Sequence, residues 1–116
     1  MKRIILLTVL LFTLSLNANE ASDYPEAFMK GIMAEKYDQT IDNYFSTNPL
    51  FTAKTQQILL VKSQVKNMFN IFGKATTYEL ALTESLSSSL MRFVYIVKHP
   101  NHPTVWEFFI YKPKDK

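Results

Sequence analysis

Two glutamates are the first candidates for chemistry. Glu79 and Glu107 fall in segments that read as β-strands, and we expect both on one sheet face, flanking Ile96. Two strand spacings would separate their backbones by about 9–10 Å, close to the roughly 6.5–9.5 Å of inverting glycosidases. Lys98 and Arg92 are expected on the same face, so ordinary cross-strand charge pairs are the competing interpretation.

Arg92 is the best candidate for holding an anionic ligand. We expect it beside Tyr111 across the strands, where a planar guanidinium fork and a phenol could grip a carboxylate or phosphate. The alternative is that Arg92 stacks on Tyr111 as surface cover. Both interpretations stay open from the sequence.

Metal and cofactor chemistry finds little support. His99 and His102 flank a proline turn, but a metal site needs a third ligand and none is near in sequence. We therefore expect a polar turn with exposed imidazoles and no metal. The chain has no cysteine, which excludes thiolate ligands, cysteine nucleophiles and disulfides, and its two glycines cannot build a glycine-rich phosphate loop. No cofactor is predicted.

The N-terminus has the layout of a secretory signal. Lys2 and Arg3 precede an apolar run of about 13 residues, 4–16, shorter than the roughly 20 of a membrane-spanning helix. We place cleavage after Ala18, with Asn19 or Ala21 as alternatives; the remaining alternative is an uncleaved anchor. The predicted organisation is a signal peptide over 1–18 and a single domain over 19–116, periplasmic or secreted, without a transmembrane helix after processing.

Charge gives no reason to expect nucleic acid as a partner. The chain has 13 Lys and Arg against 10 Asp and Glu, but two of the basic residues belong to the predicted leader. The processed chain is therefore nearly neutral, whereas a nucleic-acid-binding face needs a basic patch.

The first half of the processed chain is expected to be helical. Ser22 to Glu26 combine cap-type residues, proline and an acid, typical of a helix start. Asp38 is expected to cap a second helix, and Thr52 a third that ends at Gly73. Apolar side chains at spacings of three and four predict the buried stripes of these helices: Phe28, Met29, Ile32 and Met33, then Ile58, Val61, Val65, Met68 and Phe72.

From Thr76 the apolar period changes to two, which indicates strands. Turns at 86–89 and 100–103 separate three of them. With these turns, the expected partners are Leu82 with Phe93, Leu80 with Tyr95, Phe93 with Ile110, Tyr95 with Phe108 and Val97 with Trp106. All fall on one side. The predicted fold class is α+β: N-terminal helices packed on one face of a curved three-stranded antiparallel meander.

The other sheet face is expected to bind something. It would carry Val94, Ile96, Phe109 and Tyr111, an apolar patch too large to leave in water. We predict that this patch, with Arg92, Glu79 and Glu107, forms a homodimer interface or binds a small apolar or anionic ligand.

Helices followed by a curved sheet with a second apolar face resemble the nuclear-transport-factor-two-like (cystatin-like) α+β cone, in particular its small exported bacterial members. The resemblance is carried by the helix over 37–45, the long helix ending at Phe72-Gly73-Lys74, and the strands at 92–95 and 106–113. It implies a pocket or dimer face on the sheet and no particular reaction. Such folds usually continue into further strands, whereas this sequence ends at Lys116, so the third strand could be a free edge.

Three functions stay open. The leading one is a non-enzymatic binding or interaction protein of the cell envelope. The second is a small hydrolase or isomerase that uses Glu79 or Glu107. The third is an accessory or inhibitor subunit that pairs with a partner through the edge of the third strand.

Overall fold

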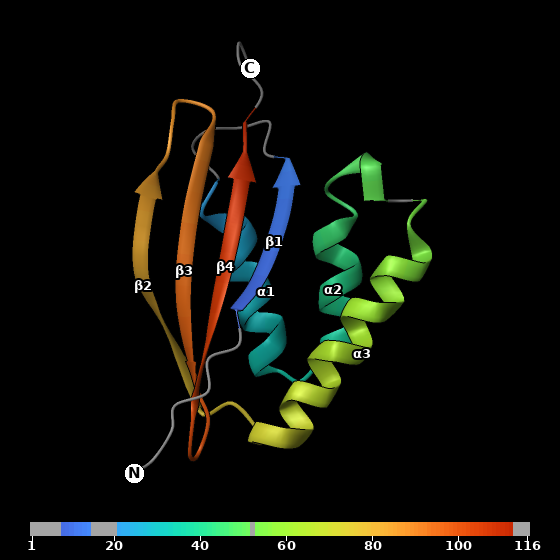
Figure 1. Ribbon diagram of the computed structural model, residues 1–116, viewed down its shortest axis with the longest axis vertical. Helices are drawn as coiled ribbons and strands as arrows, with labels where there is room; N and C mark the ends of the chain where they lie inside the picture. Colours follow the sequence, from blue (N-terminus) through green and yellow to red (C-terminus); the bar gives the residue numbers. More distant parts are fainter. Residues whose placement is uncertain (1–7, 15–20, 52, 113–116) are drawn as a thin grey trace.

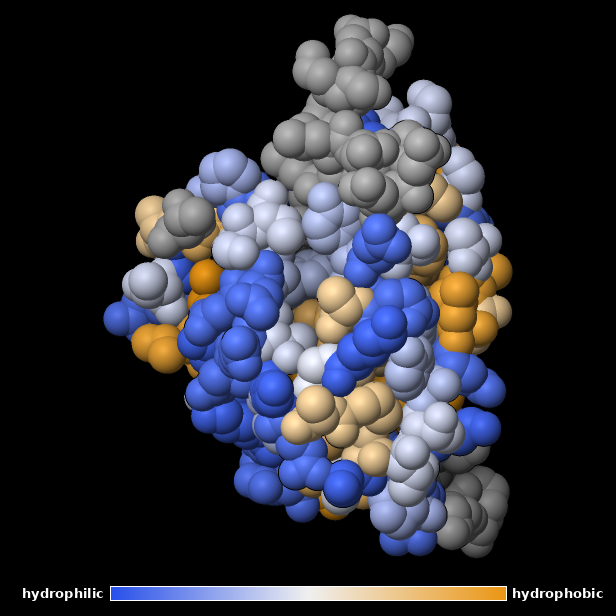
Figure 2. Space-filling model, turned by 180° about the vertical axis from the view of Figure 1, so that it is seen from behind, coloured by the Kyte–Doolittle hydropathy of each residue, from blue (hydrophilic) through white to orange (hydrophobic). Residues whose placement is uncertain are grey.

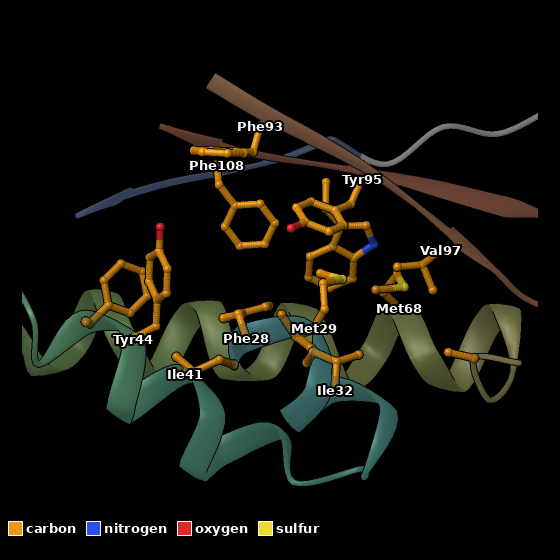
Figure 3. Close-up of a cluster of buried hydrophobic side chains, with 14 of the residues drawn as sticks. Phe28, Met29, Ile32, Ile41, Tyr44, Met68, Phe93, Tyr95, Val97 and Phe108 are labelled. Carbon is orange, nitrogen blue, oxygen red and sulfur yellow. The ribbon is translucent and has the colours of Figure 1, made fainter. Parts of the chain in front are cut away.

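The structure is a computed structural model that describes residues 21–51 and 53–112, together with the backbone of residues 8–14. Its helices are α1 (Asp23–Met33), α2 (Tyr37–Phe45) and α3 (Thr55–Phe72), with a short 3₁₀ turn at Pro49–Phe51. Its strands are β1 (Thr8–Leu14), β2 (Thr77–Ser85), β3 (Leu90–Lys98) and β4 (Pro103–Tyr111). The helices lie on one side of the sheet (Figures 1 and 3), as the predicted α+β class requires.

The helix boundaries follow the sequence signals in most places. Helix α1 begins after Ser22 and buries Phe28, Met29 and Ile32, as predicted. In α3, Val65 and Met68 are buried as expected, and Phe69 joins them. Gly73 ends this helix with a positive φ of 91°, and its N–H donates to the carbonyl of Phe69 at 2.8 Å.

The predicted N-caps of α2 and α3 are not seen among the residues that the structure describes. Asp38 does not cap α2: Lys36 precedes the helix, and Asp38 lies in the first turn, where its carboxylate pairs with Lys66 at 2.9 Å. A carboxylate there still interacts favourably with the helix dipole, so the same residue type suits both positions. The cap predicted at Thr52 lies outside the described residues.

Helices α1 and α2 approach each other closely. A Cβ atom on Gly31 would overlap the side chain of Thr40, so only glycine fits at this crossing. The turn between the helices passes through Glu35, which has a positive φ of 63°. Helices α1 and α2 therefore pack closely against each other on the helix side of the sheet.

The sheet has the strand order β1-β4-β3-β2. Strands β2, β3 and β4 form the antiparallel meander that the sequence predicts. Strand β1 is an addition: it runs parallel to β4 along the edge expected to be free. It belongs to the segment assigned to the leader, whose basic residues and cleavage site lie outside the described residues.

The predicted register of the β3–β4 hairpin is wrong by two residues. Phe93 faces Phe108 rather than Ile110, and Tyr95 faces Trp106 rather than Phe108. Val97 correspondingly faces Thr104 rather than Trp106. Strand β3 ends at Lys98 and β4 starts at Pro103, each one residue earlier than expected, so the centre of the turn moves by one residue and the pairing by two. Since a two-residue shift keeps each side chain on its face, the predicted faces of β3 and β4 are correct.

A β-bulge changes the faces of β2. Leu80 pairs with Tyr95 as predicted, but Leu82 pairs with Val94 rather than Phe93, so the register shifts between them. From Leu82 onward, residues expected on the helix side lie on the opposite side. Leu80 and Leu82 are 46% and 43% exposed, so neither belongs to the core.

The core lies between the helices and the inner face of the sheet (Figure 3). Phe28 of α1 contacts Tyr44 of α2 and both Trp106 and Phe108 of β4 through its ring. The largest fully buried side chains are Trp106, Tyr95, Phe28, Phe93 and Phe108. Within the described part of the chain, no helix is long and apolar enough to span a membrane.

Candidate functional site

The candidate site is the outer face of the sheet, the side opposite the helices. We define it by Glu79, Glu84, Arg92, Val94, Ile96, Glu107, Phe109 and Tyr111. Strand β3 positions it: Phe93, Tyr95 and Val97 point to the helices and are buried, while the alternate residues Arg92, Val94 and Ile96 point outward and are partly exposed. None of the described helices covers this face (Figure 1).

Arg92 is held between two carboxylates. Its Nη1 donates to Oε1 of Glu84 at 2.8 Å, and its Nη2 donates to Oε2 of Glu107 at 2.7 Å. These hydrogen bonds, first that to Glu107 and then that to Glu84, raise the pKa of Arg92 above its usual value. Two carboxylates against one guanidinium leave a local excess of negative charge, so the expected anionic ligand loses its electrostatic basis here.

The predicted neighbour of Arg92 is also different. Phe109, rather than Tyr111, lies directly across from Arg92, and Tyr111 pairs with Leu90. The two-residue register shift causes this change. Tyr111 remains on the outer face at the end of β4 and is 43% exposed.

Glu84 is an outer-face residue that the sequence reasoning missed, as is Leu82. Strict alternation from Tyr78 places Glu84 on the helix side, but the bulge moves it to the outer side, opposite Arg92. The segment contains no glycine or proline to mark the bulge. The available signal was charge: an acid on the buried face without a basic partner argues against simple alternation.

The two candidate catalytic glutamates do not form a pair. Glu79 lies opposite Ile96, whereas Glu107 lies opposite Val94, so they do not flank one residue as expected. Glu79 forms an ion pair with Lys98 at 3.6 Å, and Glu107 is bound by Arg92. The arrangement is one of cross-strand charge pairs, the competing interpretation of the sequence.

The apolar part of the outer face remains partly exposed. Val94 and Ile96 of β3 and Val105 and Phe109 of β4 are only partly buried, although they lie on central strands. They form an aliphatic and aromatic surface between the Arg92 cluster at one end and the Glu79–Lys98 pair at the other.

His99 differs from the exposed imidazole that we expected. It is 6% exposed, and both ring nitrogens lie 2.9 Å from hydrogen-bond partners, Nδ1 from the Gly73 carbonyl and Nε2 from Thr104 Oγ1. Since a carbonyl only accepts, Nδ1 carries the proton and the Thr104 hydroxyl donates to Nε2. Thr104 Oγ1 also accepts from the Trp106 indole at 2.8 Å. His99 therefore joins α3 to the β3–β4 turn.

His102 packs its ring against Phe72 at a centroid distance of 5.5 Å. The two histidines thus have different surroundings. Among the described residues, no group of three metal-ligating side chains comes together.

A carboxylate beneath the sheet was also missed. Glu26 of α1 accepts hydrogen bonds from Tyr78 at 2.9 Å and Tyr95 at 2.8 Å, one at each oxygen. Burial, and then the hydrogen bond to Glu26, raise the pKa of both tyrosines above the usual value, so both stay neutral donors. These residues are 52 and 69 positions apart in sequence, so no local pattern could indicate the cluster.

The helix side carries a different kind of feature, an open hollow of about 470 Å³ between α1 and α2. Tyr24, Phe28, Lys36 and Asn43 are among its lining residues. Figure 2 shows that hydrophilic side chains dominate this side of the molecule. The lining of the hollow itself includes apolar side chains such as Phe28 and Ala27.

Comparison of the chain with family models, with curated proteins and with solved structures finds no match. The resemblance to the nuclear-transport-factor-two-like cone therefore stays a prediction, and functional inference depends on the outer face and the sheet edge.

Proposed function

We propose that this chain is an exported protein of the cell envelope that acts by binding, and that the outer face of its sheet is the interface with a second copy. The observation that carries this proposal is the pairing of charges on that face. Arg92 and Lys98 are already bound to glutamates, while Val94 and Ile96 remain partly exposed beside them. The secretory layout of residues 1–18 supports export.

A second copy suits this face because its charges nearly cancel: Arg92 and Lys98 are paired with three glutamates, which leaves a net charge of only −1. In a two-fold dimer, the same patch meets itself, so a strongly charged face would repel its twin. Here each cation is bracketed or paired within its own sheet, and the aliphatic side chains between the ion pairs can pack against their counterparts. Two such sheets would stack about 10 Å apart, the spacing of β-sandwiches.

The size of the face indicates a weak dimer. Each strand of the meander has nine residues, or about 30 Å of length, and three strands span about 14 Å. The projected area of about 400 Å² is below the roughly 800 Å² per partner of a standard interface. We therefore expect association that depends clearly on protein concentration.

Sedimentation equilibrium of Ile96→Lys and Leu60→Lys tests the proposal. Both substitutions replace an aliphatic side chain by lysine, but Leu60 is a 58% exposed residue of α3, on the other side of the molecule. We expect Ile96→Lys to weaken dimerisation at least tenfold because it places a desolvated charge at the interface. Leu60→Lys should match the original chain. Equal association of both variants, or a monomeric original chain, would refute the proposal.

A further inference from the structure

The outer edge of β4 is paired with β1. Seven consecutive residues pair in parallel, from Thr8 with Val105 to Leu14 with Tyr111. Figure 1 shows β1 alongside β4 at the end of the sheet. The sequence, however, assigns this segment to the leader, so its removal would leave the β4 edge open.

The direction of the backbone groups on this edge follows from the hairpin. His99 N–H donates to the His102 carbonyl at 3.0 Å, and Lys112 N–H donates to the Ser89 carbonyl at 2.7 Å. In an antiparallel pair, hydrogen-bonded positions alternate. Phe108 therefore directs its N–H and C=O to β3, whereas Val105 and Glu107 direct theirs to β1.

The same reasoning orients β1. In a parallel ladder, a residue that bonds to its neighbour strand lies opposite a position whose own groups point away. Leu11 lies opposite Phe108 and Thr13 opposite Ile110, so both direct their backbone groups to β4. Leu10, opposite Glu107, directs its groups away from the sheet.

Tyr44 adds a second observation beside this edge. Its side chain is 4% exposed, and its hydroxyl has no hydrogen-bond partner among the described residues. The hydroxyl points from α2 towards the sheet (Figure 3), and α2 is the helix that contacts β1. A buried hydroxyl without a partner costs about 1–3 kcal/mol, so a ligand at this edge that bonds to Tyr44 would recover this free energy.

We infer that the β4 edge is a strand-acceptor site that, after leader removal, binds an extended, uncharged apolar segment of a partner protein parallel to β4. The occupant seated there now shows the chemistry that fits, because residues 8–14 carry no charge and run parallel to β4. A partner segment with a hydrogen-bonding group opposite Tyr44 would satisfy its hydroxyl. Main-chain pairing would supply affinity, and the contact with Tyr44 specificity.

A second copy of this chain fits the edge less well. Two β4 strands related by a two-fold axis would run antiparallel, unlike the parallel strand observed here. Strand β2 of a second copy could run parallel, but it carries Glu79 and Glu84, and such pairing would propagate an open-ended sheet. The inference concerns a different surface from the proposed dimer face, so either can fail alone.

Amide hydrogen exchange of the full chain, with and without a proline in β1, tests the inference. Leu11→Pro removes an N–H directed to β4, whereas the matched control Leu10→Pro removes one directed away. We expect Leu11→Pro to speed exchange at Val105 and Glu107 at least tenfold while Phe108 stays protected. Leu10→Pro should change these rates little. If Leu11→Pro also loses protection at Phe108, its sheet is disrupted, and Thr13→Pro takes its place, because the N–H of Thr13 is also directed to β4.

The probe is a peptide of sequence TVLLFTL with two lysines at each end for solubility. Added to the Leu11→Pro chain, it should slow exchange at Glu107 at least tenfold, whereas the same peptide with proline at its fourth residue should not. If the peptide leaves the exchange rate at Glu107 unchanged while Phe108 stays protected, the inference is overturned. Protection that rises with protein concentration without peptide would also overturn it, because a second copy would then occupy the edge. In an Ile96→Lys background the peptide should act equally well, which separates this test from that of the dimer.

Discussion

The two faces of the sheet differ in what covers their side chains. On the inner face, Tyr95, Trp106 and Phe108 are completely buried by helices of the same chain. On the outer face, one residue away along the same strands, Val94 and Ile96 stay partly exposed beside charges that are paired among themselves. We therefore expect the inner face to contribute most of the stability, and we propose the outer face as the surface for association.

The largest contrast should come from neighbouring residues of β4. Trp106→Ala removes the largest fully buried side chain and should lower the free energy of unfolding by about 3–5 kcal/mol, comparable to the whole stability of a small domain. Val105→Ala, on the outer face, should cost about 1 kcal/mol or less. Urea unfolding measures both; similar losses would contradict the division of roles between the faces.

Alkaline pH should destabilise the fold through the inner-face tyrosines. The pKa values of Tyr78 and Tyr95 are raised in the folded chain, chiefly by burial, whereas unfolded tyrosines ionise near pH 10. Their contribution is therefore present below about pH 10 and is lost as the pH rises above it, with a slope that approaches about 1.4 kcal/mol per pH unit for the buried Tyr95 and is smaller for the more exposed Tyr78. Chemical unfolding between pH 8 and 11 should show this decline, with a smaller slope in Tyr95→Phe. An equal slope in that variant would exclude Tyr95 as a cause.

Carboxylates on the two faces should also differ. Glu26→Gln weakens the hydrogen bonds from Tyr78 and Tyr95 and should lower the free energy of unfolding by about 1–2 kcal/mol. Glu107→Gln, on the partly exposed outer face, should have a smaller effect, because solvent screens its ion pair with Arg92. Thermal unfolding of the two variants compares them directly. A larger loss for Glu107→Gln would reverse our assignment of stability to the inner face.

The smallest effect should be a gain. Tyr44→Phe removes a buried hydroxyl without a partner among the described residues, and should stabilise the chain by about 1 kcal/mol. The measurement is the urea midpoint at constant slope. Destabilisation would mean that this hydroxyl is already satisfied, and it would remove the argument for specificity at the β4 edge.

Features that depend on residues close together in sequence could be predicted, and features that depend on distant residues could not. The buried stripe of α1 and the inner residues of β3 and β4 could be predicted, because period and burial depend on neighbours in sequence. The hairpin pairing was wrong by two residues because the position of Pro103 at the start of β4 was misjudged. That error moved Tyr111 away from Arg92 without changing its face.

Other features depend on contacts that no local pattern records. No glycine or proline marks the bulge between Leu80 and Leu82. The hydrogen bond between Arg92 and Glu84, which depends on this bulge, could therefore not be predicted. The Glu26 cluster joins a helix to two strands, and His99 is buried because α3 ends beside the hairpin turn. Such groups are determined by tertiary packing, which periodicity alone does not describe.

Native mass spectrometry of the protein isolated from its own envelope tests the central claim most directly. The account predicts a dimer without a bound small molecule, and a monomer for Ile96→Lys under the same conditions. A monomer at all concentrations, whether bare or carrying a ligand, would contradict the assignment of the outer face to a second copy.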